Sequence, residues 1–178
     1  QPASYISGLT FCKPEMLEKM VQDGEKNQSD VVVAGRYLVD VRNDRFWEQS
    51  LPKSYVEHSQ ANCHTPDINI FRGLGDAPWN KLYLRDFIIN ENIIFHQTPP
   101  QDDVFFVLTA LILAERICFE PHSFYYYRSN LSTSQMGTID KQPINFLVAL
   151  LEVHGQIPLD DFILQKQLIG IRFTRSVK

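Results

Sequence analysis

The sequence has no long hydrophobic run and no surplus of basic residues. Its longest strongly apolar stretch, Val104 to Ala114, contains Thr109 and is much shorter than the roughly 20 residues that span a bilayer. This length excludes a transmembrane helix. Seventeen Lys and Arg stand against 21 Asp and Glu, which gives a formal net charge of −4. A general nucleic-acid binder usually carries a basic surplus, so no nucleic acid is expected as a partner.

Cysteine is also scarce, and its spacing is uninformative for a metal or redox site. The three residues, Cys12, Cys63 and Cys118, form no CxxC pair, which argues against a zinc ribbon or a thioredoxin-type site. An odd, widely spaced set also argues against a disulfide scaffold and fits a reducing compartment. The five histidines lack HxH or HExxH spacing, so they predict no metal site. We therefore expect a cytoplasmic protein without metal ligands of its own.

What the chain does have is enough apolar material for a globular core. Hydrophobic residues make up 44% of its 178 residues. A helix is predicted over 14–23, with Gly24 as its C-terminal cap. The β-branched run 31–34 predicts a buried strand, which continues through 37–41 to a turn at Asn43-Asp44. This order predicts a layered α/β fold.

The pattern is irregular over residues 46–76 and predicts regular elements from residue 79 onward. Residues 46–76 contain Pro52, Pro66, Gly73 and Gly75, and predict a long functional loop with one short helix. The later pattern predicts strands at 79–84, 92–95 and 118–128, helices at 85–90, 101–117, 144–154 and 159–173, and a loop at 130–140.

The first chemical candidate is the acidic pair Asp102-Asp103, which opens the most apolar helix directly after a diproline break. A carboxylate at a helix start beside a cleft can act as a general base on a hydroxyl group. The plainer explanation is that the pair complements the helix dipole, which stabilises the helix by about 0.3 to 1 kcal/mol per charge.

Two further segments carry side chains suited to sugars or phosphates. Trp79 and Lys81, in the run Pro78-Trp79-Asn80-Lys81-Leu82-Tyr83, can stack on a ring and orient polar groups. Arg128 ends an aromatic strand, and Ser132 follows it in a hydroxyl-rich loop that can close over a diphosphate. A core Trp and surface charges remain the plainer alternatives.

Taken in order and spacing, these motifs resemble the later part of a family 2 glycosyltransferase with the GT-A fold. The resemblance is carried by residues 78–88, 92–95, 102–106, 125–128 and Ser132, and extends to the helix and strand at 14–20 and 29–33.

The resemblance implies a nucleotide-diphospho-sugar donor, a glycan hydroxyl acceptor and a divalent cofactor, Mn or Mg. It makes Asp103 the catalytic base, with Asp102 beside it in place of the usual glutamate. Trp79 and Lys81 would line the acceptor side. Arg128 and Ser132 would lie over the diphosphate.

The chain departs from the family in two ways. The segment before Pro14, residues 6–13, has no carboxylate where the family has its aspartate-x-aspartate metal motif, which argues against metal-dependent transfer by this chain alone. The βα units that hold the nucleotide are also missing. We therefore expect a partial GT-A fold with a mixed sheet flanked by helices, as a transferase-like portion over 1–140 and a C-terminal helical hairpin over 141–178.

Several alternatives stay open. The chain is either the acceptor-side portion of an enzyme of bacterial polysaccharide synthesis or a non-catalytic module that binds a glycan or a partner subunit. A third reading is an α/β domain with neither role. The C-terminal helices could pack on the core, form a homodimer face or touch the inner surface of the membrane, where the basic tail, Arg172, Arg175 and Lys178, would assist.

Overall fold

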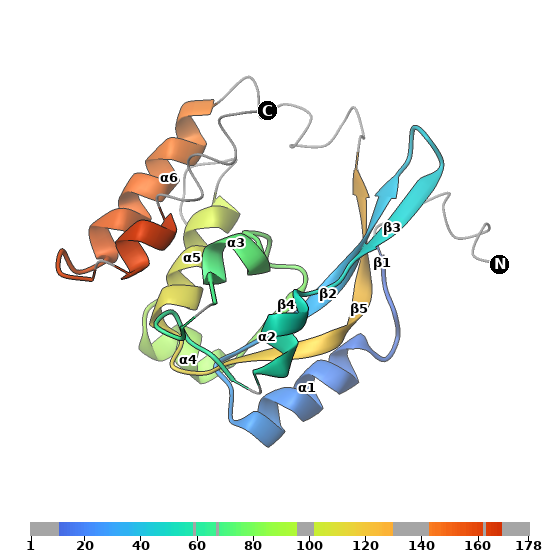
Figure 1. The fold of residues 1–178 in the computed structure, drawn as a ribbon, viewed down its shortest axis with the longest axis horizontal. Helices are drawn as coiled ribbons and strands as arrows, with labels where there is room; N and C mark the ends of the chain where they lie inside the picture. Colours follow the sequence, from blue (N-terminus) through green and yellow to red (C-terminus); the bar gives the residue numbers. More distant parts are fainter. Residues whose placement is uncertain are drawn as a thin grey trace.

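The computed structural model describes residues 11–58, 60–66, 68–95, 102–129, 143–161 and 163–168. A mixed sheet lies at its centre (Figure 1). Its described strands are β1 (Phe11–Cys12), β2 (Val31–Asp40), β3 (Arg45–Gln49), β4 (Lys81–Tyr83) and β5 (Ile117–Ser129). The order across the sheet is β1-β5-β2-β3, and β4 pairs with the first residues of β2. β2 and β5 are parallel and the other pairs are antiparallel, so the mixed sheet predicted from the sequence is confirmed.

Helices cover both faces of this sheet. They are α1 (Met16–Asn27), α2 (Lys53–Glu57), α3 (Ile70–Leu74), α4 (Arg85–Asn90), α5 (Asp102–Leu113) and α6 (Pro143–Gln156), and residues 163–168 are also helical. α1 packs on one face, where Met20 contacts the cluster around Val32 and Phe124. α2, α3, α5 and α6 bury their apolar side chains on the other face. Within the described residues, no helix is long and apolar enough to cross a membrane.

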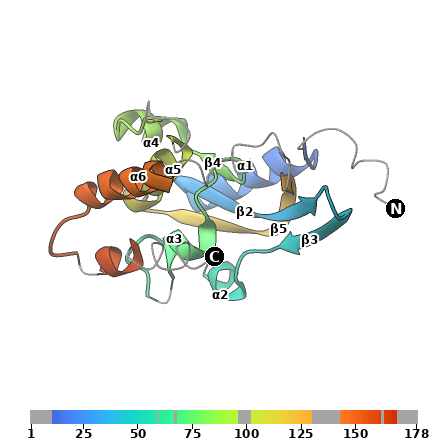
Figure 2. The ribbon, with the colours of Figure 1, turned by 90° about the horizontal axis from the view of Figure 1, so that it is seen from above.

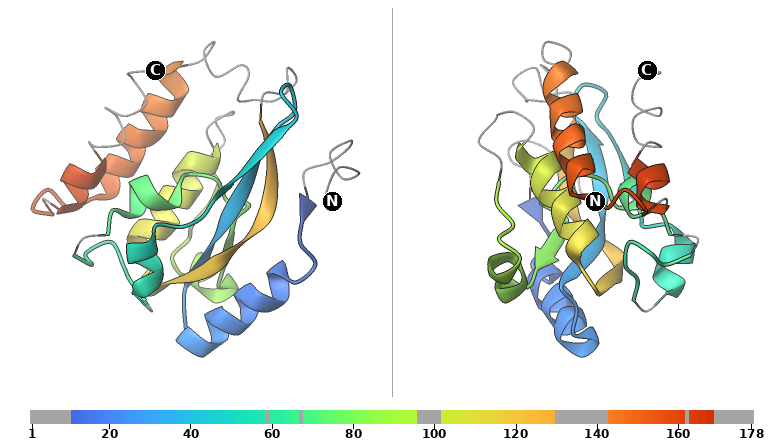
Figure 3. Two further views of the ribbon diagram at one scale, coloured as in Figure 1. Left: turned by 45° about the vertical axis from the view of Figure 1, so that its right-hand side comes forward. Right: turned by 90° about the vertical axis from the view of Figure 1, so that its left-hand side faces the viewer.

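The largest core lies between the sheet and α5. Leu108 and Leu111 of α5 are at most 1% exposed, as its almost uniformly apolar sequence predicts. α6 lies beside α5 (Figure 3), and its Leu150 and Val153 belong to the same core. The helical residues 163–168 add Leu168 to that core. The described C-terminal helices thus share the core of the residues before them.

The sheet has an inner half and an outer half. The inner half, residues 31–35 and 117–120 with β4, is nearly all buried under helices. The outer half, residues 36–40 and 125–129 with β3, is mostly half-buried or exposed, and it extends away from α5 and α6 (Figure 2). The two halves meet at an irregularity, where Ala34 pairs with Glu120 but Gly35 pairs with Ser123.

The helix expected over 14–23 is α1, but it runs past Gly24, so the expected cap is wrong. The chain ends the helix at Gln28 instead, in the left-handed conformation (φ 50°). Gly24 faces the sheet, where a Cβ atom would lie 3.2 Å from Val32 Cγ2. Glycine at this position permits close packing and does not terminate the helix.

The expected loop over 46–76 is only partly correct. Its start is β3, which forms a hairpin with β2 through the predicted turn, where Asp44 has a φ of 48°. Every residue of β3 is exposed, so the strand has no alternation of buried and exposed positions that the sequence could reveal. Two short helices, α2 and α3, follow where one was expected.

Two other boundaries differ. The strand expected over 92–95 is absent, because Asn92 takes a left-handed φ of 52° and Ile93 N–H closes the end of α4 on Ile88 C=O. α5 ends at Leu113 and not at 117, because the Asp30 carboxylate accepts the next free N–H groups, those of Glu115 and Arg116. The strand over 118–128 and the helix over 85–90 are confirmed as β5 and α4. The loop over 130–140 and the basic tail lie outside the described residues.

Candidate functional site

Asp102 and Asp103 form the amino end of α5, and the Asp103 side chain is exposed. α5 leads directly into β5 and therefore runs antiparallel to it. The helix is about 18 Å long, whereas β5 extends over about 43 Å. The amino end of α5 therefore lies alongside the middle of β5, near the irregularity that separates the two halves of the sheet. Ligands of open α/β sheets bind beyond the carboxyl ends of parallel strands, and those ends of β2 and β5 lie in the outer half of this sheet.

Aromatic side chains surround the first turn of α5. Phe106 lies one turn after Asp103 on the same side of the helix. Its ring stacks on Phe95, with centroids 4.0 Å apart, and meets Tyr83 of β4 edge-on at 5.2 Å. Burial, with a further contribution from Asp103, raises the pKa of the Tyr83 hydroxyl well above its ordinary value. The negative charge of Asp103 thus disfavours ionisation of Tyr83. The Tyr83 hydroxyl is buried and has no hydrogen-bond partner among the described residues.

Trp79 lies in the loop before β4 and belongs to a stack of protein side chains. Its ring is nearly parallel to Tyr125 (4.4 Å, 16°) and to Tyr127 (4.9 Å, 7°) of β5. The Arg36 guanidinium of β2 lies over it at 5.3 Å. Parallel stacking and cation–π contact both fix the indole. Trp79 is therefore a half-buried part of a rigid aromatic surface on the outer half of the sheet.

Lys81 is buried, with only 7% of its surface exposed. It faces Val33 across the β2–β4 pair, so its side chain lies on the face of the sheet that α3 and α5 cover. Its ammonium donates to Leu74 C=O (3.0 Å), Ala77 C=O (2.8 Å) and Asn80 Oδ1 (3.0 Å). These three bonds use every hydrogen that an ammonium has. The structure thus places Lys81 inside the protein, one residue along the strand from the half-buried Leu82.

Arg128 lies on the outer half of β5. Successive side chains of a strand point to opposite faces, so Arg128 faces away from the Tyr127–Trp79 stack. Its Nε atom is buried without a hydrogen-bond partner among the described residues. Tyr126 shares the Arg128 face and stacks between Phe11 (4.4 Å) and Tyr37 (4.5 Å). The structure therefore separates Trp79 and Arg128, while Ser132 lies outside the described residues.

A second ionisable cluster lies across the sheet, between α1 and β5. Burial and a hydrogen bond with Glu120 raise the pKa of Asp23 to about 6. Burial also acts to raise the pKa of Glu120, but hydrogen bonds from Asp23 and His122 lower it below its ordinary value. The His122 ring approaches Glu120 Oε1 to 2.6 Å. Below about pH 6 the two carboxyl groups thus share a proton, and the cluster joins α1 to the irregular part of β5.

No metal centre is present in the described part of the chain, where no group of three or more His, Cys, Asp or Glu side chains could hold a metal ion. The Mn or Mg that the sequence resemblance implies therefore remains a prediction. Of the segment 6–13, where the sequence resemblance implies a metal motif, residues 6–10 lie outside the described residues.

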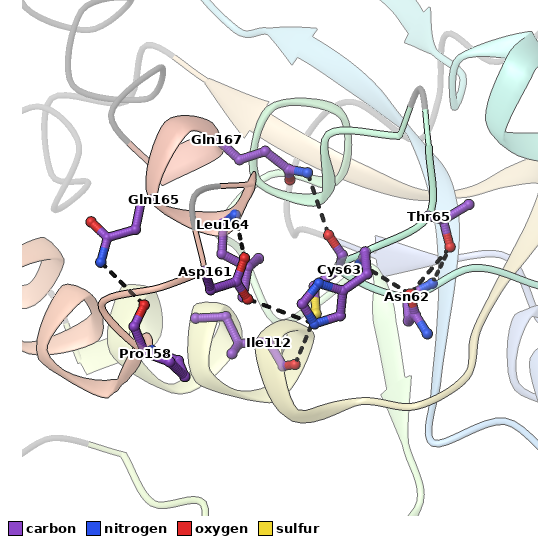
Figure 4. A network of polar contacts seen from close by, with 10 residues as sticks. Asn62, Cys63, Thr65, Ile112, Pro158, Asp161, Leu164, Gln165 and Gln167 are labelled. Atoms are coloured by element: carbon purple, nitrogen blue, oxygen red, sulfur yellow. Dashed lines mark hydrogen bonds and ion pairs between the residues drawn. The ribbon is translucent and has the colours of Figure 1, made fainter.

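Cys63 and Asp161 lie close together (Figure 4), and His64 pairs with Asp161, but the geometry differs from that of a nucleophilic site. The Cys63 thiol donates to Ile112 C=O at 3.4 Å, and burial raises its pKa. His64 Nε2 instead faces Asp161 Oδ2 at 3.7 Å. Gln167 donates to the carbonyls of Cys63 and Ile68. This network ties the loop before α3 to the helical residues 163–168, and its thiol remains protonated and buried.

The fold resembles solved glycosyltransferase structures. S. aureus TarS 1–349 in complex with UDP-GlcNAc matches with a TM-score of 0.64 and 18% sequence identity, over 89% of this chain and 43% of that one. TarS 1–349 in complex with UDP matches with a TM-score of 0.60 and 17% identity, over 89% and 41%. The chain thus spans less than half of these proteins. No family model and no curated protein sequence matches it. At this identity the likeness shows a glycosyltransferase-like α/β fold.

The sequence alone did not point to Arg36 or Tyr83 as parts of the site. Arg36 interrupts an otherwise apolar strand, and a charged residue in such a run can indicate a specific side-chain contact, here with Trp79. Tyr83 belongs to the quoted motif, but only the three-dimensional structure places its ring against Phe106, below Asp103.

Proposed function

We propose that the chain is the acceptor-side portion of a family 2 glycosyltransferase. It would transfer a sugar from a nucleotide-diphospho-sugar to a glycan hydroxyl in bacterial polysaccharide synthesis, in the cytoplasm. The observation that carries this proposal is the exposed Asp103 carboxylate at the amino end of α5, beside the middle of the sheet. The fold of TarS, which was crystallised with UDP-GlcNAc and with UDP, supports the choice of donor.

The chemistry assigned to Asp103 is general-base catalysis. The acceptor hydroxyl attacks the anomeric carbon from the side opposite the leaving diphosphate, and the bond between that carbon and the diphosphate oxygen breaks. Asp103 takes the proton of the hydroxyl as the new glycosidic bond forms, so the configuration inverts. Asp102 is the neighbouring carboxylate, and Trp79 supplies an aromatic wall for the acceptor.

Two observations lead us to expect that the chain binds the sugar-nucleotide donor weakly. The chain covers 43% of TarS 1–349, and residues 4–13 of the chain contain no Asp or Glu. We therefore expect weak binding of UDP, without dependence on manganese. Calorimetry with UDP, in the presence and absence of MnCl₂, measures this. Micromolar, manganese-dependent binding would show a complete donor site and contradict the acceptor-side assignment.

A non-catalytic module that binds a glycan or a partner subunit is the second candidate. The missing carboxylates in residues 4–13 favour it. Release of UDP from millimolar UDP-GlcNAc by a complete parent protein that contains this chain separates the two functions. A transferase releases UDP, with water or a glycan as the acceptor, whereas a binding module releases none.

A further inference from the structure

The loop between α3 and β4, residues 75–80, is built around a single buried cation. The Lys81 ammonium bonds to the carbonyl of Leu74, where α3 ends, to Ala77 in the middle of the loop and to the side chain of Asn80 at its end. Asn80 is itself fixed to β2, since its Nδ2 donates to Ala34 C=O at 2.8 Å and Ala34 N–H donates to Asn80 C=O at 3.0 Å. The cation therefore connects both ends of the loop to the sheet.

The same loop presents Trp79 to the outer half of the sheet. At its start, Gly75 has a left-handed φ of 69°, and a Cβ atom there would lie 3.3 Å from Arg36 Nη1. Arg36 in turn lies over the Trp79 ring. The path of the loop, the position of Arg36 and the orientation of Trp79 are thus parts of one arrangement.

Two charged groups act on the Lys81 ammonium. Burial lowers the pKa of Lys81 to about 7, the Asp76 carboxylate opposes this shift, and Arg36 adds to it. Loss of the proton leaves a neutral amine with two hydrogens for three acceptors. One of the loop oxygens would then lose its partner in a buried position, which is unfavourable.

We propose that Lys81 is a positioning residue, whose ammonium holds loop 75–80 in the shape that stacks Trp79 on Tyr125 and Tyr127, and that it does not bind the substrate. This role differs from the direct acceptor contact expected from the sequence. It deepens the proposed function. Only the use of the loop as a wall for the acceptor rests on that function.

Trp79 fluorescence tests the proposal directly. Of the two tryptophans, Trp47 lies on the exposed strand β3, so the Trp47→Phe protein reports on Trp79 alone. In this background, Lys81→Met is expected to raise the acrylamide quenching constant of Trp79 about twofold, because the loop opens locally while the core stays folded. Lys53→Met is the matched control, since that lysine side chain is 92% exposed. Unchanged quenching in a folded Lys81→Met protein would overturn the proposal.

Should Lys81→Met fail to fold, the Trp47→Phe protein supplies a second measurement. Quenching of Trp79 is expected to rise as the pH passes from 6 to 8, around the Lys81 pKa of about 7, while far-UV circular dichroism stays constant. Quenching that is constant over this interval would contradict the proposal. Neither measurement involves a sugar nucleotide. A protein that responds as expected but never releases UDP would refute the proposed function and retain the positioning role.

Discussion

The inner and outer halves of the sheet use the same two long strands for different purposes. In the inner half, β2 and β5 present mostly apolar side chains to α1 and α5, and almost nothing is accessible to solvent. In the outer half, the same strands carry Arg36, the tyrosines of residues 125–127 and Arg128, which are only half-buried. Tyr125 and Tyr127 stack on Trp79, and Tyr126 stacks on Tyr37. We infer that the inner half supplies most of the stability and that the outer half, with the amino end of α5, supplies the binding surface.

The largest loss of stability is expected from the inner half. Leu111→Ala removes a fully buried side chain of α5 and should lower the free energy of unfolding by about 3 kcal/mol, through lost burial and a residual cavity. Phe46→Ala in β3 removes a larger side chain that is 50% exposed, and should cost about 0.5 kcal/mol. Urea unfolding followed by circular dichroism measures both. Equal losses would contradict the division into two halves.

The boundary between the halves should be intolerant of a single methyl group. In Gly35→Ala the new Cβ would lie 2.2 Å from Ser123 Oγ, so we expect a loss of about 2 kcal/mol from overpacking. The double variant Gly35→Ala/Ser123→Ala removes the clashing oxygen and should recover at least half of that loss. Thermal unfolding of the single and the double variant measures this recovery of stability. No recovery would place the strain elsewhere than at this contact.

A smaller, pH-dependent effect is expected at the Asp23–Glu120 pair. Because the pKa of Asp23 is raised to about 6, the folded state binds this proton more tightly than the unfolded state does. The wild-type protein therefore loses stability as the pH rises from 4 to 6. Asp23→Asn removes this dependence and should be more stable at pH 8 by about 1 kcal/mol, a value reduced for solvent screening. At pH 4 the two proteins should unfold at similar urea concentrations, and an equal gain at both pH values would contradict the shared proton.

The comparison of the two halves also explains how much could be read from the sequence. The strand at 31–34 and the helix 101–117 follow from uniform apolar runs, and α4 was predicted at its observed bounds, 85–90. β3 could not be predicted, because it is exposed on both faces and exists only through its pairing with β2. The outer half depends on partners distant in sequence, which local patterns do not record.

The sequence proposed residues for the candidate site, but it missed Arg36 and Tyr83 and could not give the orientation of any side chain. The order of the motifs identified Asp103, Trp79, Lys81 and Arg128, and their catalytic and binding roles remain predictions. The strand register determines on which face of the sheet each side chain lies, which the sequence alone could not give. It turns Lys81 inward, opposite Val33, and it turns Arg128 away from Tyr127 and Trp79.

The smallest effect on stability is expected at Asp103. Its side chain is exposed, and the Asn of Asp103→Asn keeps a polar group at the helix start, so the free energy of unfolding should change by about 0.5 kcal/mol or less. Urea unfolding at pH 7 measures it. A loss like that of Leu111→Ala would make Asp103 a structural residue.

The most direct test of the account is the release of UDP from millimolar UDP-GlcNAc by a complete, active parent enzyme that contains this chain, by its Asp103→Asn variant and by its Asp86→Asn variant. The last is a matched control on α4, where the Asp86 side chain is 76% exposed. The account predicts turnover by the wild type and by Asp86→Asn, with a loss of about a hundredfold in Asp103→Asn, as expected for a missing general base. Equal turnover in all three proteins would assign the base elsewhere, and no turnover in any of them would contradict the transferase function and favour the binding module.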